Sequence, residues 1–157
     1  MIKVIKHLRQ ISNEYNVLFC DIWGCIHNGK IPYKRALEAL IKFKRNGGFV
    51  MLLTNAPRPK SAVKEHLSTF GIFENHFDDI TTSGDAAQNS MLSGNVGTKV
   101  YHLGPERDLS FFMDIPKETN PKKNIQRVEL HSSEGIVCTG LFDDRKETPE
   151  NYKDIIK

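Results

Sequence analysis

The first residues in the sequence that could do chemistry follow a short apolar run. Residues 17–20 (Val-Leu-Phe-Cys) show no helical period and are followed at once by Asp21 and then by Gly24. This pattern predicts a buried parallel strand that ends in a carboxylate and a glycine turn. A carboxylate in that position is placed to attack an electrophile as a nucleophile, usually beside a bound cation.

A second apolar run ends in the groups that an anion needs. Residues 49–53 are all apolar, and Thr54 and Asn55 follow them before a helix that begins around residues 57–60. A hydroxyl and free backbone N–H groups at a helix start form a ready anion site. A nucleophilic Asp21, a Mg²⁺ ion and this phosphate site together predict phosphoryl transfer through an aspartyl-phosphate.

Alternating strands and helices would bring these groups together. Apolar residues spaced three and four apart over residues 36–43, closed by Asn46-Gly47-Gly48, predict an amphipathic helix with a glycine stop. A second helix is predicted to run to Gly71, followed by a strand at residues 79–82 and a helix from Ser83. This order predicts a right-handed α/β unit with a parallel, Rossmann-like sheet covered on both faces. Ligands bind at the carboxyl ends of such strands, so the polar tips should face one crevice.

The second half of the chain predicts a smaller α/β region. Residues 93–98, with two glycines, interrupt all periodicity and form the best linker. Strands are predicted at residues 100–104 and 135–140, flanking a polar stretch at 120–124, and a helix near Thr148 and Pro149. We therefore expect a core at residues 1–92, a linker at 93–98 and a further region at 99–157.

Composition excludes several classes of protein. The 157 residues are 39% hydrophobic and 26% charged with a net charge of +3, which indicates a globular domain rather than a nucleic-acid binder. No apolar run reaches the roughly 18 residues that a membrane span needs, and the first ten residues contain no signal-peptide core. Three cysteines without a paired pattern favour a reducing, cytoplasmic setting. We expect no nucleic acid and no membrane among the partners.

The residues around both strand ends resemble a known family. Residues 17–29 (VLFCDIWGCIHNG) resemble motif I of the haloacid dehalogenase superfamily, and residues 50–57 (VMLLTNAP) resemble its motif II. Residues 82–86 and 139–144 resemble the class IIA branch, which contains sugar- and nucleotide-phosphatase-like proteins with a cap domain inserted after motif II. The expected fold is therefore the N-terminal part of a haloacid-dehalogenase-like core joined to the beginning of a class IIA cap.

This resemblance assigns roles to individual residues. It implies that Asp21 is the nucleophile and a Mg²⁺ ligand, and that Thr54, Asn55 and Gly24 hold the transferring phosphoryl group. The family normally has a second aspartate, the general acid and base, two positions after the nucleophile, where this sequence has Trp23. An indole cannot exchange a proton at neutral pH, which removes a contribution of typically 10²- to 10⁴-fold. The backbone carbonyl of Trp23 could still bind Mg²⁺.

The later motifs of the family are harder to find. Asp143 and Asp144 are the late acidic pair preceded by an apolar run, and they fit either metal ligands or a solvated turn, of which the turn is favoured. The chain therefore resembles a C-terminally truncated member. The function that the resemblance implies is Mg²⁺-dependent hydrolysis of a small phosphorylated metabolite. The alternative is a catalytically inactive remnant or phosphate-binding module.

Truncation has a consequence for association. The strand at residues 17–20 would have an unpaired edge, and its apolar side would lack covering helices, so we expect the chain to self-associate. Among the other polar residues, a loop histidine such as His27 is expected to face solvent, and Asp85 is expected to interact with the dipole of its own helix. Cys20 is expected to be a small buried hydrophobe.

Overall fold

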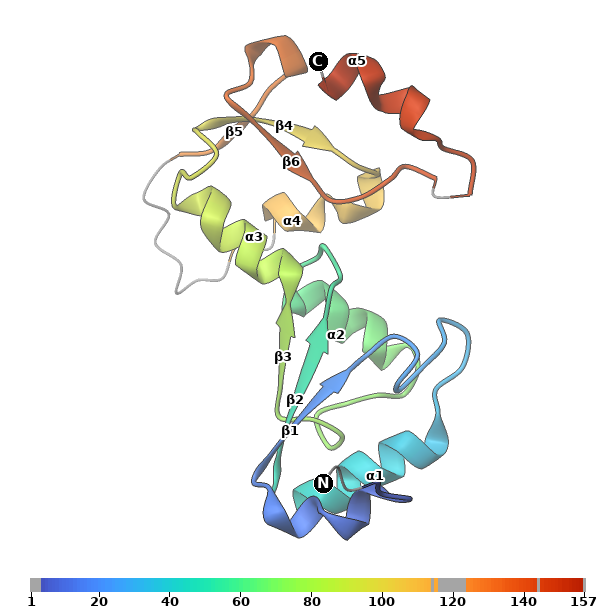
Figure 1. Cartoon of the computed structure of the whole chain (residues 1–157). Helices are drawn as coiled ribbons and strands as arrows, with labels where there is room; N and C mark the ends of the chain where they lie inside the picture. Colours follow the sequence, from blue (N-terminus) through green and yellow to red (C-terminus); the bar gives the residue numbers. More distant parts are fainter. Residues whose placement is uncertain (1–3, 114, 116–123, 144, 157) are drawn as a thin grey trace. The chain divides into compact units, whose positions relative to one another are not determined.

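The computed structural model describes residues 4–113, 115, 124–143 and 145–156. The chain divides into two compact units (Figure 1). The first is Met1–Thr54 with Val63–Thr81, and the second is Asn55–Ala62 with Thr82–Lys157. Asp144 and the polar stretch at residues 120–123 lie outside the described residues.

The first unit is built on a three-stranded sheet with the order β1-β2-β3 (Figure 1). The strands are β1 (Val17–Asp21), β2 (Phe49–Thr54) and β3 (Asp79–Thr82), connected through α1 (Lys34–Arg45) and α2 (Lys60–Ser68). Strands β1 and β2 are parallel, with Val17 opposite Phe49 and Asp21 opposite Leu53. The predicted order of strands and helices is confirmed.

The predicted glycine stop after α1 is also confirmed. Gly47 has a φ of +87°, and the N–H of Gly48 donates to the Phe43 carbonyl over 3.1 Å. This is the pattern of a left-handed helix end, which glycine adopts without the steric cost that a side chain adds. It turns the chain from α1 directly into β2.

Among the described residues only one face of this sheet is covered, which corrects the prediction of helices on both faces. Val50 and Leu52 are 0% exposed, whereas on the opposite face Val17, Phe19 and Phe49 are 45%, 63% and 42% exposed. Both crossovers run in the same direction along β1-β2-β3, and right-handed crossovers in one direction place their helices on the same face. Strand β1 is therefore a half-exposed edge strand in the described structure, and the prediction that it is buried was wrong.

The second unit has its own parallel sheet with the order β5-β4-β6. Its elements are α3 (Ser83–Leu92), β4 (Lys99–Leu103), α4 (Ser110–Met113), β5 (Gln126–Arg127), β6 (Gly135–Cys138) and α5 (Lys153–Ile156). Met91 and Leu92 of α3 form a buried core with Val100, Phe111 and Val137. The two strands predicted in this half are confirmed.

Its final helix begins near the predicted residue. A 3₁₀ turn at Pro149–Tyr152 leads into α5, and the Thr148 N–H donates to the Asn151 side-chain oxygen over 2.8 Å. The expected division into residues 1–92, 93–98 and 99–157 stays a prediction. In the structure, the C-terminal end of α3 packs in the core of the second unit. No helix in the described ranges is both long and apolar enough to cross a membrane.

Candidate functional site

Asp21 is the last residue of β1, and its side chain is exposed. Beyond it the ladder continues for one bond, because the Ile22 N–H donates to the Leu53 carbonyl over 3.1 Å. Alternation along the strand places the Asp21 side chain on the same face as Val17 and Phe19, the half-exposed face of the sheet. The carboxylate is therefore accessible to a ligand at the carboxyl end of the sheet.

Thr54 lies beside this end of β1, on the neighbouring strand. It is the last residue of β2 and follows Leu53, which pairs with Asp21. Neighbouring strands lie about 4.8 Å apart, and the side chain of Thr54 starts from the opposite face to that of Asp21. The structure thus brings Asp21 and Thr54, the two residues predicted from the sequence, to the same end of the sheet.

Gly24 shapes the turn that follows Asp21. Its φ is +79°, and its N–H donates to the His27 carbonyl over 2.8 Å. An added Cβ at this position would meet no atom within 4 Å, so neighbouring atoms do not exclude a side chain. The positive φ is the reason that glycine is favoured here. Because its N–H is engaged in the turn, Gly24 contributes the course of the loop rather than a free donor.

Trp23 stands on the outside of this loop and is 63% exposed. Its indole packs against Gly29, which has a φ of +80° and has no room for a Cβ beside the ring. Among the described residues, the Trp23 carbonyl accepts no hydrogen bond. The side chain offers no acid, but the carbonyl oxygen is free to bind a cation.

His27 is buried behind this loop, so the expectation that it faces solvent was wrong. It is 2% exposed and stacks on Phe70 with ring centroids 4.7 Å apart, while Trp23 and His66 contact it edge-on at 5.5 and 6.2 Å. Burial, and to a smaller extent the neighbouring His66, lowers the pKa of His27. Its Nδ1 accepts a hydrogen bond from the Gly29 N–H over 2.9 Å. His27 is therefore a neutral packing residue that holds the loop.

Asn55 and the start of α2 belong to the second unit. The sequence predicted free backbone donors at this helix start, but the Lys60 N–H donates to the Asp85 carboxylate over 3.0 Å. The Asp85 N–H in turn donates to the Thr82 hydroxyl over 2.8 Å. Asp85 therefore caps α2 in addition to lying in the first turn of α3, and this part of the expected anion site is already occupied by the protein's own carboxylate.

The oxygen donors near Asp21 fit Mg²⁺ in part. Mg²⁺ commonly binds one or two carboxylates and keeps its other positions for water and substrate phosphates. The Asp21 carboxylate and the Trp23 carbonyl would supply two oxygen ligands. In the part of the chain that the structure describes, no three His, Cys, Asp or Glu side chains gather in a way that could hold a metal.

Asp143 takes part in a turn, as the favoured interpretation predicted. Its carboxylate accepts from the Arg145 N–H over 3.1 Å and lies 3.2 Å from the Lys146 ammonium, and its own N–H donates to Glu147. These contacts use the carboxylate within the turn itself.

The Cys20 thiol, next to Asp21 in the sequence, is a poor nucleophile. Burial raises the pKa of Cys20 to about 11, with smaller contributions from Cys25 and Asp21, so this thiol is protonated at neutral pH. Cys20, Cys25 and Cys138 are all free cysteines. The Asp21 carboxylate therefore stays the predicted nucleophile at the end of β1.

The first unit is an α/β structure with a parallel sheet and an accessible aspartate at the carboxyl end of its first strand. Comparison with known proteins identifies the family. The profile described as "Haloacid dehalogenase-like hydrolase" matches residues 18–115. The chain belongs to this family of hydrolases, and the resemblance seen in the sequence is confirmed at that level.

A solved structure supports the same assignment over almost the whole chain. The crystal structure of a hydrolase of the haloacid dehalogenase-like family from Brucella suis 1330 is 33% identical, with a TM-score of 0.84 over 98% of this chain. The match covers 55% of that protein, so this chain spans about half the length of its relative. Comparison with curated proteins gave no match.

Proposed function

We propose that this chain carries the nucleophile of a Mg²⁺-dependent phosphohydrolase, which acts on a small phosphorylated metabolite through an aspartyl-phosphate at Asp21. The observation that carries the proposal is the position of Asp21, exposed at the carboxyl end of β1 and beside Thr54 at the end of β2. Membership of a hydrolase family makes hydrolysis the expected reaction.

The reaction has two steps. An Asp21 carboxylate oxygen attacks phosphorus, and the bond from phosphorus to the leaving oxygen breaks. The leaving oxygen takes its proton from water, because Trp23 has no acidic proton to give. A water molecule then attacks the same phosphorus, the bond to Asp21 breaks, and inorganic phosphate and the free carboxylate are regenerated.

Thr54 supplies a neutral donor to this reaction. Its hydroxyl donates a hydrogen bond to a phosphoryl oxygen, where charge is distributed in the transition state. Bound Mg²⁺ would supply positive charge to the phosphoryl oxygens, held by the Asp21 carboxylate and the Trp23 carbonyl. Gly24 positions the loop that presents that carbonyl.

A phosphate-binding module without turnover is the second candidate function. Trp23 favours it, since the residue that would protonate the leaving group is replaced by one that cannot. Such a module would keep the Thr54 donor and the anion-binding strand end and would release its ligand unchanged.

The test is hydrolysis of 4-nitrophenyl phosphate by the full chain, with MgCl₂ and with EDTA. We expect Mg²⁺-dependent turnover in the parent protein and its loss in Asp21→Asn, which keeps the shape of the side chain and removes the nucleophile. Asp143→Asn is the matched control and should retain the parent rate. Equal, chelator-insensitive rates in all three proteins contradict the proposal.

A parent protein without turnover separates the two candidates. If it binds inorganic phosphate, and Thr54→Val abolishes that binding, the phosphate-binding module is supported instead of the enzyme. The proposed location is the cytoplasm, supported by the free cysteines at positions 20, 25 and 138. We propose neither nucleic acid nor a membrane as a partner.

A further inference from the structure

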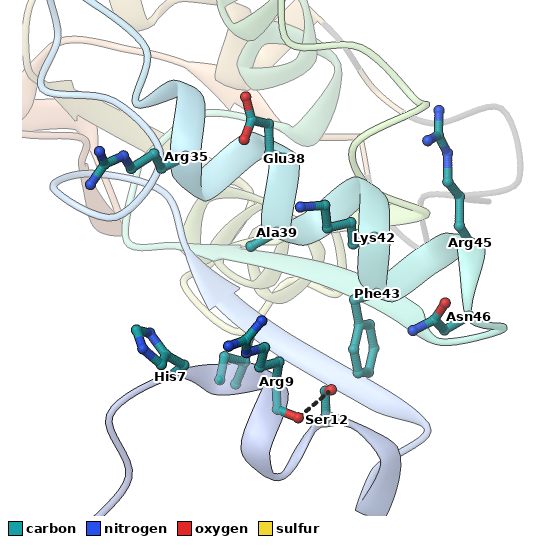
Figure 2. Close-up of a pocket in the computed structure, with 11 residues that line it drawn as sticks. His7, Arg9, Ser12, Arg35, Glu38, Ala39, Lys42, Phe43, Arg45 and Asn46 are labelled. Carbon is teal, nitrogen blue, oxygen red and sulfur yellow. Dashed lines mark hydrogen bonds between the residues drawn. The ribbon is translucent and has the colours of Figure 1, made fainter.

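A cavity of about 680 Å³ lies within the first unit, on the side of α1 that faces the N-terminal segment (Figure 2). Its apolar wall is formed by Leu8 from the 3₁₀ turn Leu8–Gln10 and by Ala39 and Phe43 from α1. The volume is in the range of roughly 300–1,000 Å³ that is typical of small-molecule sites. The cavity is therefore large enough to hold an organic ligand.

The polar lining of this cavity is strongly cationic. Arg9, Arg35, Lys42 and Arg45 line it, with Glu38 as the carboxylate. Within the described residues, none of these five side chains has an ion-pair partner. Their formal sum of +3 equals the net charge of the whole chain, so the remaining charged residues balance one another.

Two of these cations come from opposite walls. Figure 2 shows Arg9 rising from the N-terminal turn, with Lys42 on the helix that faces it. Arg45, at the end of α1, points away from the turn in the same view. An anionic ligand in the cavity would therefore have a cation on each wall.

The stability of α1 does not explain all of this charge. Cations in the last turn of a helix interact favourably with its dipole, which accounts for Lys42 and Arg45. The first turn contains Arg35 and no acidic residue, which is the unfavourable end for a cation. Arg9 lies outside the helix altogether. A ligand with negative charge would offset the repulsion among these groups.

We propose that this cavity binds a small organic polyanion. The apolar part of the ligand lies against Leu8, Ala39 and Phe43, and its anionic groups lie between Arg9 and Lys42. A concave site between two chain segments fits a small molecule better than the flat surface of a macromolecule.

This site is distinct from the one at Asp21. On one side of α1 the cavity-lining residues recur at helical spacing, at positions 35, 38, 39 and 42. Leu37 and Leu40 are buried on the other side, against the sheet. A ligand on the outer side of α1 does not meet the carboxylate at the end of β1.

The test uses isothermal titration calorimetry of the full chain in EDTA, with two probes. ADP carries phosphates on an aromatic body, and inorganic pyrophosphate carries the charge alone. We expect ADP to bind more tightly than pyrophosphate, with an affinity that falls as salt is raised. Lys42→Glu and Arg9→Glu should each weaken ADP binding about tenfold or more, because a charged hydrogen bond is removed and a repulsion is added.

Two further variants separate this cavity from other sites. Arg107→Glu makes the same charge change at an exposed arginine of the second unit and should leave the affinity unchanged. Thr54→Val should also leave it unchanged, because it alters the proposed phosphate site at the end of β2. Lys42→Gln, which introduces no negative charge, checks that a loss in Lys42→Glu is not a loss of folding.

The results that overturn the proposal are specific. Absence of ADP binding at millimolar concentration refutes the site. Binding that is lost in Thr54→Val and kept in both Lys42→Glu and Arg9→Glu assigns the ligand to the strand end instead. Equal affinities for ADP and pyrophosphate refute the role of the apolar wall.

Discussion

Phe19 is the residue whose substitution tests most directly how the uncovered face of the first sheet behaves. It is 63% exposed on β1, and Val17 and Phe49 on the same face are 45% and 42% exposed. Among the described strands β1 pairs with β2 alone, which leaves its other edge free. A free edge beside apolar surface is a template for a second chain, so we expect the isolated chain to self-associate through this face.

The exposed area sets the size of the effect. An aromatic side chain has about 200 Å² to bury, so the 63% exposed fraction of Phe19 is about 125 Å². At about 25 cal/mol per Å², covering it stabilises an associated state by up to about 3 kcal/mol for each copy. Phe19→Lys should therefore raise the dissociation constant of self-association by about 100-fold or more.

The same substitution should change the stability of the monomer less. About 75 Å² of the Phe19 side chain is buried, so its loss costs up to about 2 kcal/mol, and the methylene groups of the lysine keep part of that contact. Leu52, which is 0% exposed on the covered face, provides the contrast, since Leu52→Ala should cost about 2–5 kcal/mol. Urea unfolding of both variants measures this difference.

Sedimentation velocity over a range of protein concentrations measures the association. Phe73→Lys is the matched control, because Phe73 is 54% exposed and lies in the loop after α2 rather than on the sheet. The reasoning is refuted if the parent chain stays monomeric at all concentrations. It is also refuted if Phe19→Lys associates as strongly as the parent, or if Phe73→Lys has the same effect.

Three further predictions concern the loop after Asp21. Trp23→Asp should not raise hydrolysis of 4-nitrophenyl phosphate to ordinary enzyme rates, roughly 1 to 10³ per second. Catalytic groups that act together give non-additive effects, and the described residues contain no cluster of acidic metal ligands for the new aspartate to act with. A kcat in that range would contradict this. Gly29→Ala should destabilise the chain by more than Gly47→Ala. At Gly47 the positive φ alone costs roughly 1–2 kcal/mol, whereas at Gly29 the added methyl group must also displace the indole of Trp23. Urea unfolding gives the two costs, and a shift in the fluorescence of the single tryptophan should accompany the first alone. Burial lowers the pKa of His27, so stability should be fully present above the unfolded pKa of about 6.5 and lost as the pH falls through the lowered folded pKa. His27→Gln should reduce the difference between urea midpoints at pH 7.5 and 5.5. The pKa of His102 is also lowered, chiefly by burial, so His102→Gln should remove a separate part of that difference. An unchanged difference in His27→Gln would refute the assignment to this group.

The ends of the strands could be predicted because the signals for them are local. The apolar runs before Asp21 and Thr54, and the three- and four-residue spacing over α1, are written in consecutive residues. Since neighbouring parallel strands end at the same edge of a sheet, these local signals sufficed to place both residues together. The two-residue strand β5 (Gln126–Arg127) has no apolar run and was missed for that reason.

Other features depend on residues that are distant in the sequence. His27 is buried because His66 and Phe70, about 40 positions later, pack on it. Asp85 caps the helix that begins at Lys60, 25 positions earlier. Nothing in the sequence around His27 or Asp85 indicates these partners.

The sequence by itself determined where the longer strands and helices form and which polar residues end the first two strands, because periodicity and turn residues act over a few neighbouring positions. The tertiary structure alone decided which face of the sheet is covered, since that follows from the direction and handedness of the crossovers. It also decided that Arg9 lines the same cavity as Lys42, 33 positions later in the chain. Contacts of this kind depend on how the chain packs in space, and local propensity carries no record of them.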